Sequence, residues 1–276
     1  MAIGFSKMHG AGNDFVLLDL RHGQAPPDAA LVRAIGDRHT GVGFDQMLSI
    51  EPSDRPDCVA VYRVWNSDGS PAQQCGNGAR CVAAWLLRDG AASPPRFKLH
   101  SPAGVIEVDC LADGRFALEM GRPEFAPARI PFLADAERDQ YELLLGGEPV
   151  SFGAVAMGNP HALIVVEDIA GAPVATLGPA LQSAPCFPEG VNVGFAQIIS
   201  PAGIRLRVWE RGAGETLACG SGACAAVAIL VRQGRLGRQV DVQLPGGSLA
   251  ISWPSDAAPV RMAGPTAFVF EGEWLA

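Results

Sequence analysis

Lysine is scarce in this sequence, and positive charge is in the minority. Lys7 and Lys98 are its only lysines, every other basic side chain except histidine is an arginine, and the net charge is −8. An acidic chain with scattered basic residues is a poor partner for nucleic acid or for an anionic membrane surface. We therefore expect neither kind of partner, and we draw no function from the preference for arginine.

Long hydrophobic runs are also missing. The first fifteen residues hold no apolar core of signal-peptide length. The most apolar run, residues 217–231, is interrupted by two glycines and is too short to span a bilayer. Seven cysteines without an export signal suggest reduced thiols. We predict a cytoplasmic protein.

The chain does contain a long segment that is repeated. Residues 63–90 read RVWNSDGSPAQQCGNGARCVAAWLLRDG, and residues 207–234 read RVWERGAGETLACGSGACAAVAILVRQG. The two segments lie 144 positions apart and agree at 11 of 28 positions, where unrelated segments of this composition would agree at roughly two. The spacing is too long for a solenoid repeat. It indicates a duplication that produced two similar halves.

Both copies predict the same local structure. Residues 58–65 and 203–210 alternate in polarity and are rich in β-branched residues, as strands are. A glycine-rich loop follows, and a Cys-Gly-x-Gly element then opens an apolar helix that stops at Gly90 or Gly234. Since these helices are apolar on most faces, each should be buried in the middle of its half.

The rest of the chain is mostly strand-like, with a shorter helix expected at 31–38. The proline-rich residues 122–132 are the best linker candidate. The strand-like segments alternate and break at Gly, Pro and Asp; they are residues 97–111, 116–121, 162–168, 240–253 and 267–275.

We therefore predict an α/β fold of the α+β type with two pseudosymmetric halves, each a mostly antiparallel sheet wrapped around a central helix. Residues 1–119 with 265–276 would form the half that carries Cys75. Residues 120–264 would form the half that carries Cys219.

A cysteine opens each predicted central helix, at Cys75 and Cys219. The first helix amides have no internal partner, and the helix dipole places about half a positive charge there, so we expect each thiol pKa to fall below ~8.5. The glycines that follow would let a ligand approach the backbone, and the same amides could hold a carboxylate. Two such cysteines on opposite faces of one carbon could invert it, one removing a proton and the other delivering one.

The alternative is that both cysteines are small buried residues kept by the duplication, since buried cysteine is often inert. The repeated glycines, and the polar Asn77 and Ser221 beside them, weigh against this alternative. Cys81 and Cys224 lie inside the helices and are expected in the core. Because the cysteine spacing is not that of a zinc or iron–sulfur site, we expect no metal.

Several motifs in order along the chain resemble those of the diaminopimelate epimerase family. They are KMHGAGNDF, GVGFDQ, WNSDGS, QCGNGARC, GNPHA, GVNVGFAQ and RVWERGAGETLACGSGACA, from residue 7 to about residue 228. The resemblance implies an enzyme of bacterial lysine and peptidoglycan-precursor synthesis that interconverts LL- and meso-diaminopimelate with a cysteine pair. It also implies two α/β halves, no pyridoxal phosphate or metal, and a homodimer.

The resemblance implies residue roles as well. Cys75 and Cys219 match the two acid/base residues, and the amides at Gly76–Asn77 and Gly220–Ser221 match the groups that hold the reacting carboxylate. His161 and Glu210 match positions that tune the cysteines. The remaining matches to substrate-binding positions are Asn13, Gln46, Asn66, Asn159, Asn192, Glu210 and Arg211. The guanidinium fork of Arg211 suits the carboxylate of the distant amino-acid head.

Simpler readings stay open for single residues. Gly-Asn-Asp and Gly-Asn-Pro are ordinary turn sequences, Asn192 could cap a bend, His161 alone would more often be a satisfied polar residue, and Glu210–Arg211 alone would be a surface pair. Phe270 stands where family members often have a tyrosine of the dimer contact, so the dimer is less firmly implied than the chemistry.

Two other functions also stay open. One is a proline or hydroxyproline racemase, which would use the same two-cysteine logic; the other is a non-catalytic module that binds anions at the helix ends. Arg211 and the asparagines favour a substrate with a distant charged head, which proline lacks.

Overall fold

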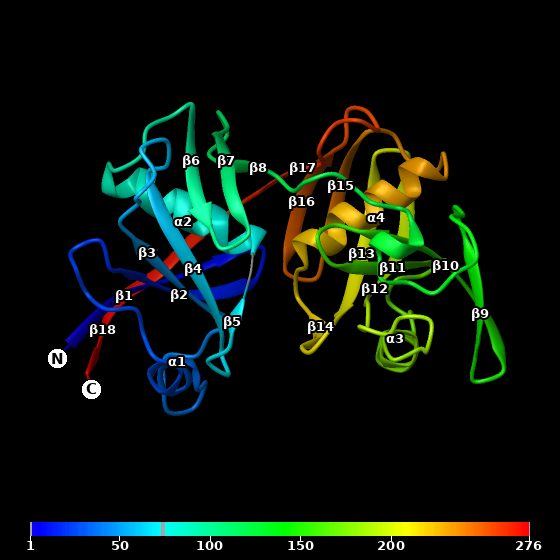
Figure 1. Cartoon of the computed structure of the whole chain (residues 1–276), viewed down its shortest axis with the longest axis horizontal. Coiled ribbons are helices and arrows are strands. Elements are labelled where there is room, and N and C mark those ends of the chain that lie inside the picture. Colours follow the sequence, from blue (N-terminus) through cyan, green and yellow to red (C-terminus); the bar gives the residue numbers. More distant parts are fainter. Residues whose placement is uncertain (1, 73–74, 276) are drawn as a thin grey trace. The chain divides into compact units, whose positions relative to one another are not determined.

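A computed structural model describes residues 2–72 and 75–275, which divide into two compact units (Figure 1). Unit 1 comprises residues 1–118 and 264–276, and unit 2 comprises Glu119–Ala263. The predicted halves, 1–119 with 265–276 and 120–264, have junctions one residue away from these.

Unit 1 is built on one mixed sheet whose strands follow the chain closely. Most neighbours are antiparallel, but β2 pairs with β3, and β4 with β6, in parallel. The strands in bonding order are β18 (Ala267–Leu275), β1 (Ala2–Gly10), β2 (Asn13–Asp19), β3 (Gln46–Glu51), β4 (Ala60–Asn66), β6 (Arg96–Ser101), β7 (Gly104–Cys110) and β8 (Phe116–Glu119), with β5 (Pro71–Ala72) also on β4.

Helix α2 (Gly76–Asp89) packs against strands β1 to β4 of this sheet, as Figure 1 shows. Cys75 is its N-cap, and Gly90 ends it in the left-handed conformation (φ 81°), which glycine adopts without a Cβ penalty. Helix α1 (Ala29–Gly36) begins at Asp28, whose carboxylate accepts the Leu31 amide at 2.8 Å. The prediction of a helix stop at Gly90 is confirmed.

Unit 2 repeats the strand order of unit 1. Its parallel pairs, β11–β12 and β13–β15, fall at the places equivalent to β2–β3 and β4–β6. The strands in bonding order are β9 (Tyr141–Leu145), β10 (Glu148–Ala156), β11 (Pro160–Val165), β12 (Asn192–Ser200), β13 (Gly203–Glu210), β15 (Gln239–Leu244), β16 (Gly247–Ser252) and β17 (Arg261–Gly264), with β14 (Gly214–Thr216) on β13.

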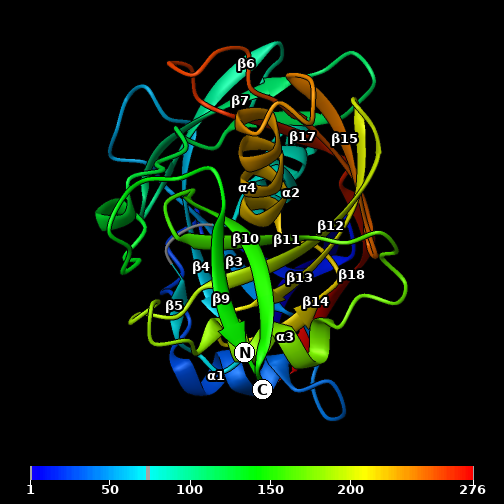
Figure 2. The ribbon, with the colours of Figure 1, turned by 90° about the vertical axis from the view of Figure 1, so that its right-hand side faces the viewer.

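Helix α4 (Gly220–Arg232) is the counterpart of α2 and lies on strands β10, β11, β12 and β16 (Figure 2). Cys219 is its N-cap, and its residues from Ala223 to Leu230 are all buried. The two-halved α/β fold with a buried central helix in each half is therefore confirmed. The described helices include none with the length and hydropathy needed to cross a bilayer.

Two features of unit 2 differ from expectation. Helix α3 (Val174–Gln182) was not predicted, because Pro179 inside it is a strong helix-breaking signal. The expected linker, residues 122–132, is not a free connector: it contains the 3₁₀ helix η1 (Pro127–Arg129). Ile130 is fully buried, and the Phe132 ring stacks on Phe187 with a centroid distance of 4.6 Å. The apolar side chains on either side of Pro131 anchor this segment in the core.

Candidate functional site

Cys75 is the N-cap of α2 and lies next to two predicted site residues. Its sulfur accepts the Gly78 amide at 3.4 Å and lies 3.7 Å from Asn13 Oδ1, to which the thiol donates. The side-chain amide of Asn77 donates to the same oxygen at 3.3 Å. The structure therefore brings Asn13, Cys75 and Asn77 together around one amide oxygen.

The other predicted residues of unit 1 come from neighbouring strands. Gln46 and Asn66 are opposite one another on β3 and β4, and Gln46 Nε2 donates to Asn66 Oδ1 at 3.0 Å. Asn66 in turn donates to Ser70 Oγ at 3.1 Å. These amides are already ordered by one another, which lowers the entropy lost when they hold a ligand.

Arg80 is a member of this region that sequence reasoning missed. It is fully buried in α2, and its Nη2 donates to Asn77 Oδ1 at 2.8 Å. Gly10 lies close by, where a Cβ would come within 3.4 Å of the guanidinium. The signal that could have found Arg80 is a charge near the start of α2, far from the other two charges of this helix, Arg88 and Asp89, which lie in its last turn. A buried arginine is normally paired.

Cys219 is surrounded differently. Its side chain is buried, with 4% of the residue exposed, and its thiol donates to Glu210 Oε2 at 3.0 Å. The other oxygen of Glu210 accepts the Thr216 hydroxyl at 2.5 Å. Ser221 Oγ lies 3.6 Å from the sulfur. Glu210 ends β13 and Thr216 ends β14, so the turn between these paired strands places both beside the start of α4.

The pKa of Cys219 is raised well above its ordinary value, first by burial and then by the charge and the hydrogen bond of Glu210. The predicted lowering of this pKa is therefore wrong for Cys219 in this state. The helix end does lie beside the sulfur, but the loss of water and a carboxylate at 3.0 Å outweigh it. Cys219 is a thiol with a proton acceptor already in contact.

The remaining residues of unit 2 form a second polar group. Asn192 is 3% exposed; its Nδ2 donates to Pro160 O at 3.1 Å, and its Oδ1 accepts the Arg211 amide at 2.8 Å. The Arg211 guanidinium is exposed and donates to Glu189 O at 2.7 Å. Asn192 thus ties the backbone of Arg211 to β11, which gives it a positioning contact besides its predicted contact with substrate.

His161 is 2% exposed, and its Nε2 lies 2.8 Å from Asn159 Oδ1. Burial, together with the charge of Arg211, lowers its pKa to about 3. The imidazole is therefore neutral near pH 7, with Nε2–H donating to Asn159. It can orient Asn159 but carries no charge of its own.

The last glycine of each Cys-Gly-x-Gly element is explained by packing. A Cβ on Gly78 would lie 3.0 Å from Leu48 Cδ2, and one on Gly222 would lie 3.2 Å from both Val208 Cγ2 and Cys219 Sγ. These two glycines let the helix start approach the sheet and the cysteine. Their expected part in the approach of a ligand stays a prediction.

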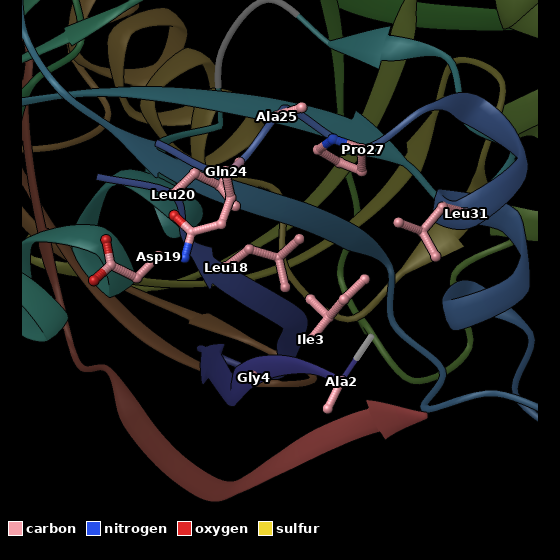
Figure 3. Close-up of a pocket in the computed structure, with 10 residues that line it drawn as sticks. All are labelled: Ala2, Ile3, Gly4, Leu18, Asp19, Leu20, Gln24, Ala25, Pro27 and Leu31. Atoms are coloured by element: carbon pink, nitrogen blue, oxygen red, sulfur yellow. The ribbon is translucent and has the colours of Figure 1, made fainter. Parts of the chain in front are cut away.

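A pocket elsewhere in unit 1 contains none of the predicted site residues (Figure 3). It lies where the β1 start, the β2 end and the segment leading to α1 meet, and its lining is Ala2, Ile3, Gly4, Leu18, Asp19, Leu20, Gln24, Ala25, Pro27 and Leu31. Asp19 and Gln24 are its polar members, and the rest is mostly aliphatic. Within residues 2–72 and 75–275, no group of three or more His, Cys, Asp and Glu is arranged to hold a metal ion.

The profile of the diaminopimelate epimerase family matches residues 5–126 and 153–269. The chain belongs to the diaminopimelate epimerase family. It is 58% identical over 271 residues to diaminopimelate epimerase of Xanthomonas euvesicatoria pv. vesicatoria (strain 85-10), covering 98% of this chain and 95% of that relative. The identity to diaminopimelate epimerase of Xylella fastidiosa (strain M12) is 56%, with the same coverage.

Solved structures of proteins with other names share the fold of this chain. A phenazine biosynthesis protein of the PhzF family from Bacillus anthracis superposes with a TM-score of 0.70 at 15% identity, covering 100% of both chains. A probable proline racemase from Agrobacterium radiobacter K84 superposes with a TM-score of 0.70 at 17% identity, covering 99% of this chain and 93% of that one. At such identities the likeness concerns the fold alone.

Proposed function

We propose that this chain is a cofactor-independent epimerase that interconverts LL- and meso-diaminopimelate in the cytoplasm, where it would serve lysine and peptidoglycan-precursor synthesis. The observation that carries the proposal is that each half presents one cysteine at the N-terminus of its central helix, within a family of enzymes of that name. Membership of the family and the two cysteine environments support the same chemistry.

In the proposed reaction, Cys75 and Cys219 act on opposite faces of one α-carbon. One sulfur, as thiolate, removes the α-proton, and the other, as thiol, returns a proton from the far side. Between these two proton transfers negative charge builds on the reacting carboxylate, and the backbone amides at Gly76–Asn77 and Gly220–Ser221 would stabilise it. Reversing the roles of the sulfurs converts the product back.

Glu210 and Arg211 support specific parts of this reaction. Glu210, 3.0 Å from the Cys219 sulfur, can take the thiol proton when Cys219 must act as the base. Arg211 is exposed and held at its backbone by Asn192, so its fork is available to the distant carboxylate of the substrate. Asn13, Gln46, Asn66 and Asn159 would bind the remaining polar groups.

The test is epimerisation in deuterium oxide. Purified protein incubated with LL-diaminopimelate should form the meso isomer and replace its α-hydrogen with deuterium, measured by proton NMR. Cys75→Ala and Cys219→Ala should each lower the rate at least about a thousandfold, because one face then lacks its proton carrier. The matched control is Cys110→Ala in β7, which removes a thiol outside the proposed site.

Three outcomes would contradict the proposal. A single cysteine variant that keeps more than about a tenth of the wild-type rate would exclude the two-base assignment. Inversion of proline instead of diaminopimelate would favour the racemase alternative. Binding of diaminopimelate without α-exchange would favour the anion-binding module.

We also propose a homodimer that uses strand β18. Phe268, Val269, Phe270 and Leu275 on this strand are 38%, 54%, 49% and 77% exposed, although they are large and apolar. Contiguous exposed apolar side chains are typical of protein interfaces. The Phe270 ring packs edge-on against the Phe5 ring, with a centroid distance of 5.9 Å. It can contact a partner as the tyrosine of other family members would, but it has no hydroxyl to form a hydrogen bond. Sedimentation equilibrium that gives a monomer mass at micromolar concentration would exclude this dimer.

A further inference from the structure

Four charged side chains lie beside the Cys75 region without a role in the proposed chemistry. Asp14 Oδ2 pairs with Lys7 Nζ at 2.5 Å and with Arg38 Nη1 at 3.2 Å, and Arg38 Nη2 reaches both Asp14 Oδ1 and Asp45 Oδ1 at 2.7 Å. Burial opposes the ionisation of Asp14, but the hydrogen bonds from Arg38 and Lys7 outweigh it and lower its pKa to about 2.

In this cluster the carboxylate of each aspartate also accepts a hydrogen bond from the backbone amide of the other. The Asp14 amide donates to Asp45 Oδ2 at 3.1 Å, and the Asp45 amide donates to Asp14 Oδ1 at 3.0 Å. This reciprocal pair fixes the residue before β3 against the start of β2. Asp45 Oδ2 therefore has a defined position, and it accepts a further bond from Asn13 Nδ2 at 2.9 Å.

The contact between Asp45 and Asn13 determines which way the Asn13 amide faces. A carboxylate only accepts hydrogen bonds, so the nitrogen of the Asn13 amide must point to Asp45. The oxygen of that amide must then point the other way. There it lies 3.7 Å from the Cys75 sulfur and 3.3 Å from the Asn77 side-chain nitrogen.

The opposite end of the same chain of amides is fixed by Arg80. A guanidinium only donates, so the oxygen of Asn77 must face Arg80, and its nitrogen must face Asn13. Arg80 and Asp45 thus impose one direction on the whole sequence Arg80, Asn77, Asn13, Asp45. Asn13 Oδ1, the acceptor in the middle of this sequence, also accepts the hydrogen bond of the Cys75 thiol.

We propose that Asp45, held in place by Arg38 and Asp14, is a positioning residue for the epimerisation, which it serves by keeping the Asn13 amide oxygen directed at Cys75. The inference rests on the proposed function, since Cys75 is an acid and a base only in that reaction. The oxygen stabilises the thiol, whereas the Gly78 amide that points at the sulfur stabilises the thiolate. Their balance lets one sulfur exist in both forms within a catalytic cycle.

The first experiment is a double-mutant cycle between Asp45 and Asn13. Asp45→Ala should lower kcat/KM for diaminopimelate about tenfold, because the freed Asn13 amide can turn its nitrogen to the sulfur. In the Asn13→Ala background the same substitution should cost less than about twofold. Asp45→Asn retains an acceptor oxygen and should lose less activity than Asp45→Ala.

The matched control is Asp113→Ala. Asp113 also accepts a backbone amide, that of Arg115 at 3.1 Å, and also pairs with an arginine side chain, at 2.8 Å, but it lies in the turn between β7 and β8. This variant should keep wild-type kcat/KM. If Asp45→Ala does not fold, as judged by its thermal transition, Asp45→Leu, which also lacks an acceptor oxygen, replaces it in the cycle.

The second experiment needs no substrate and no activity. The rate of iodoacetamide modification at neutral pH is followed by mass spectrometry of the peptide that contains Cys75. Asp45→Ala should raise this rate about threefold, because a turned Asn13 amide donates to the sulfur and favours the reactive thiolate. The rise should be absent from Asp113→Ala and from Asp45→Ala in the Asn13→Ala background.

The outcomes of the two experiments distinguish an error in this inference from an error in the proposed function. If the wild-type chain does not epimerise diaminopimelate, the function is wrong, and the alkylation rates still test the positioning. If the wild type is active, equal losses from Asp45→Ala with and without Asn13 would overturn the inference. An Asp45→Ala variant with wild-type activity and wild-type Cys75 reactivity would overturn it as well.

Discussion

The two cysteines occupy equivalent places in the duplicated halves, yet their surroundings differ in exposure and charge. Cys75 is partly exposed and donates to a neutral amide oxygen at 3.7 Å, whereas Cys219 is 4% exposed and donates to a carboxylate at 3.0 Å. The duplication kept the backbone that places each sulfur at a helix start. It did not keep the group that governs the proton of that sulfur.

The aligned repeats show where this difference arises. Glu210 occupies the position equivalent to Asn66, and Thr216 the position equivalent to Ala72. In unit 2 the carboxylate therefore lies between a hydroxyl and the thiol, whereas in unit 1 the asparagine bonds to Gln46 and Ser70. The residue at this strand end therefore forms a hydrogen bond with the cysteine in unit 2, where it is Glu210. In unit 1, where it is Asn66, it bonds to neighbouring polar side chains.

The largest effect that would sharpen this comparison is expected from Glu210→Gln. The substitution removes the acceptor charge beside Cys219, and we expect kcat to fall about a hundredfold, because the thiol loses its proton acceptor. Alkylation of Cys75 should not change. Initial rates from both stereoisomers measure the first effect, and Glu215→Gln on β14 is the control. Equal kcat in Glu210→Gln and wild type would mean that the carboxylate is not part of the proton path.

A smaller effect is expected from the hydroxyl that holds Glu210. Thr216→Val keeps the branched side chain of the strand and removes the bond to Oε1, so the carboxylate can rotate away from Cys219; kcat should fall about tenfold. Thr216→Ser keeps the hydroxyl and should stay within about twofold of wild type. Thr176→Val in α3 is the control, since its hydroxyl donates to Pro173 O. The idea fails if the serine and valine variants are equally slow.

The third effect concerns stability in acid. One titrating residue of each half, His161 in unit 2 and Asp14 in unit 1, should affect the free energy of unfolding in a different pH range. His161 has a pKa of about 3 when folded and 6.5 as its reference value, so the unfolded chain binds its proton first as the pH falls. Stability should therefore drop by about 1.4 kcal/mol per pH unit below pH 6.5 because of this residue. Asp14 acts in the same direction but at lower pH: its pKa is also lowered by folding, so its contribution is present above pH 3.8 and is lost as the pH falls from 3.8 towards about 2.

Urea unfolding of wild type and His161→Gln between pH 7 and 4 measures this effect. The glutamine variant should show the shallower decline below pH 6.5, whatever its stability at pH 7. Asp14→Asn should decline in parallel with wild type down to about pH 5, since Asp14 stays ionised there in both the folded and the unfolded chain. Parallel slopes for His161→Gln and wild type would show that His161 is protonated in the folded chain.

Local patterns in the sequence were sufficient for much of the fold. The alternation in β4 and β13, the glycines after α2 and α4 and the apolar faces of both helices are properties of neighbouring residues, so they could be predicted. Helix α3 was missed because Pro179 contradicts it locally and packing overrides that signal. Residues 122–132 were misjudged because prolines signal a connector, whereas Ile130 and Phe132 determine where it packs.

The sequence by itself determined that the chain consists of two similar halves with a cysteine at the start of each central helix. Repeats and helix caps can be recognised from consecutive residues. Only the tertiary structure decided the chemical state around each sulfur. Burial raises the pKa of Cys219, and Arg80 and Asp45 impose a direction on the amides beside Cys75, through contacts between residues distant in sequence. Such effects depend on lost water and on distances of about 3 Å, and neither quantity is encoded in local spacing.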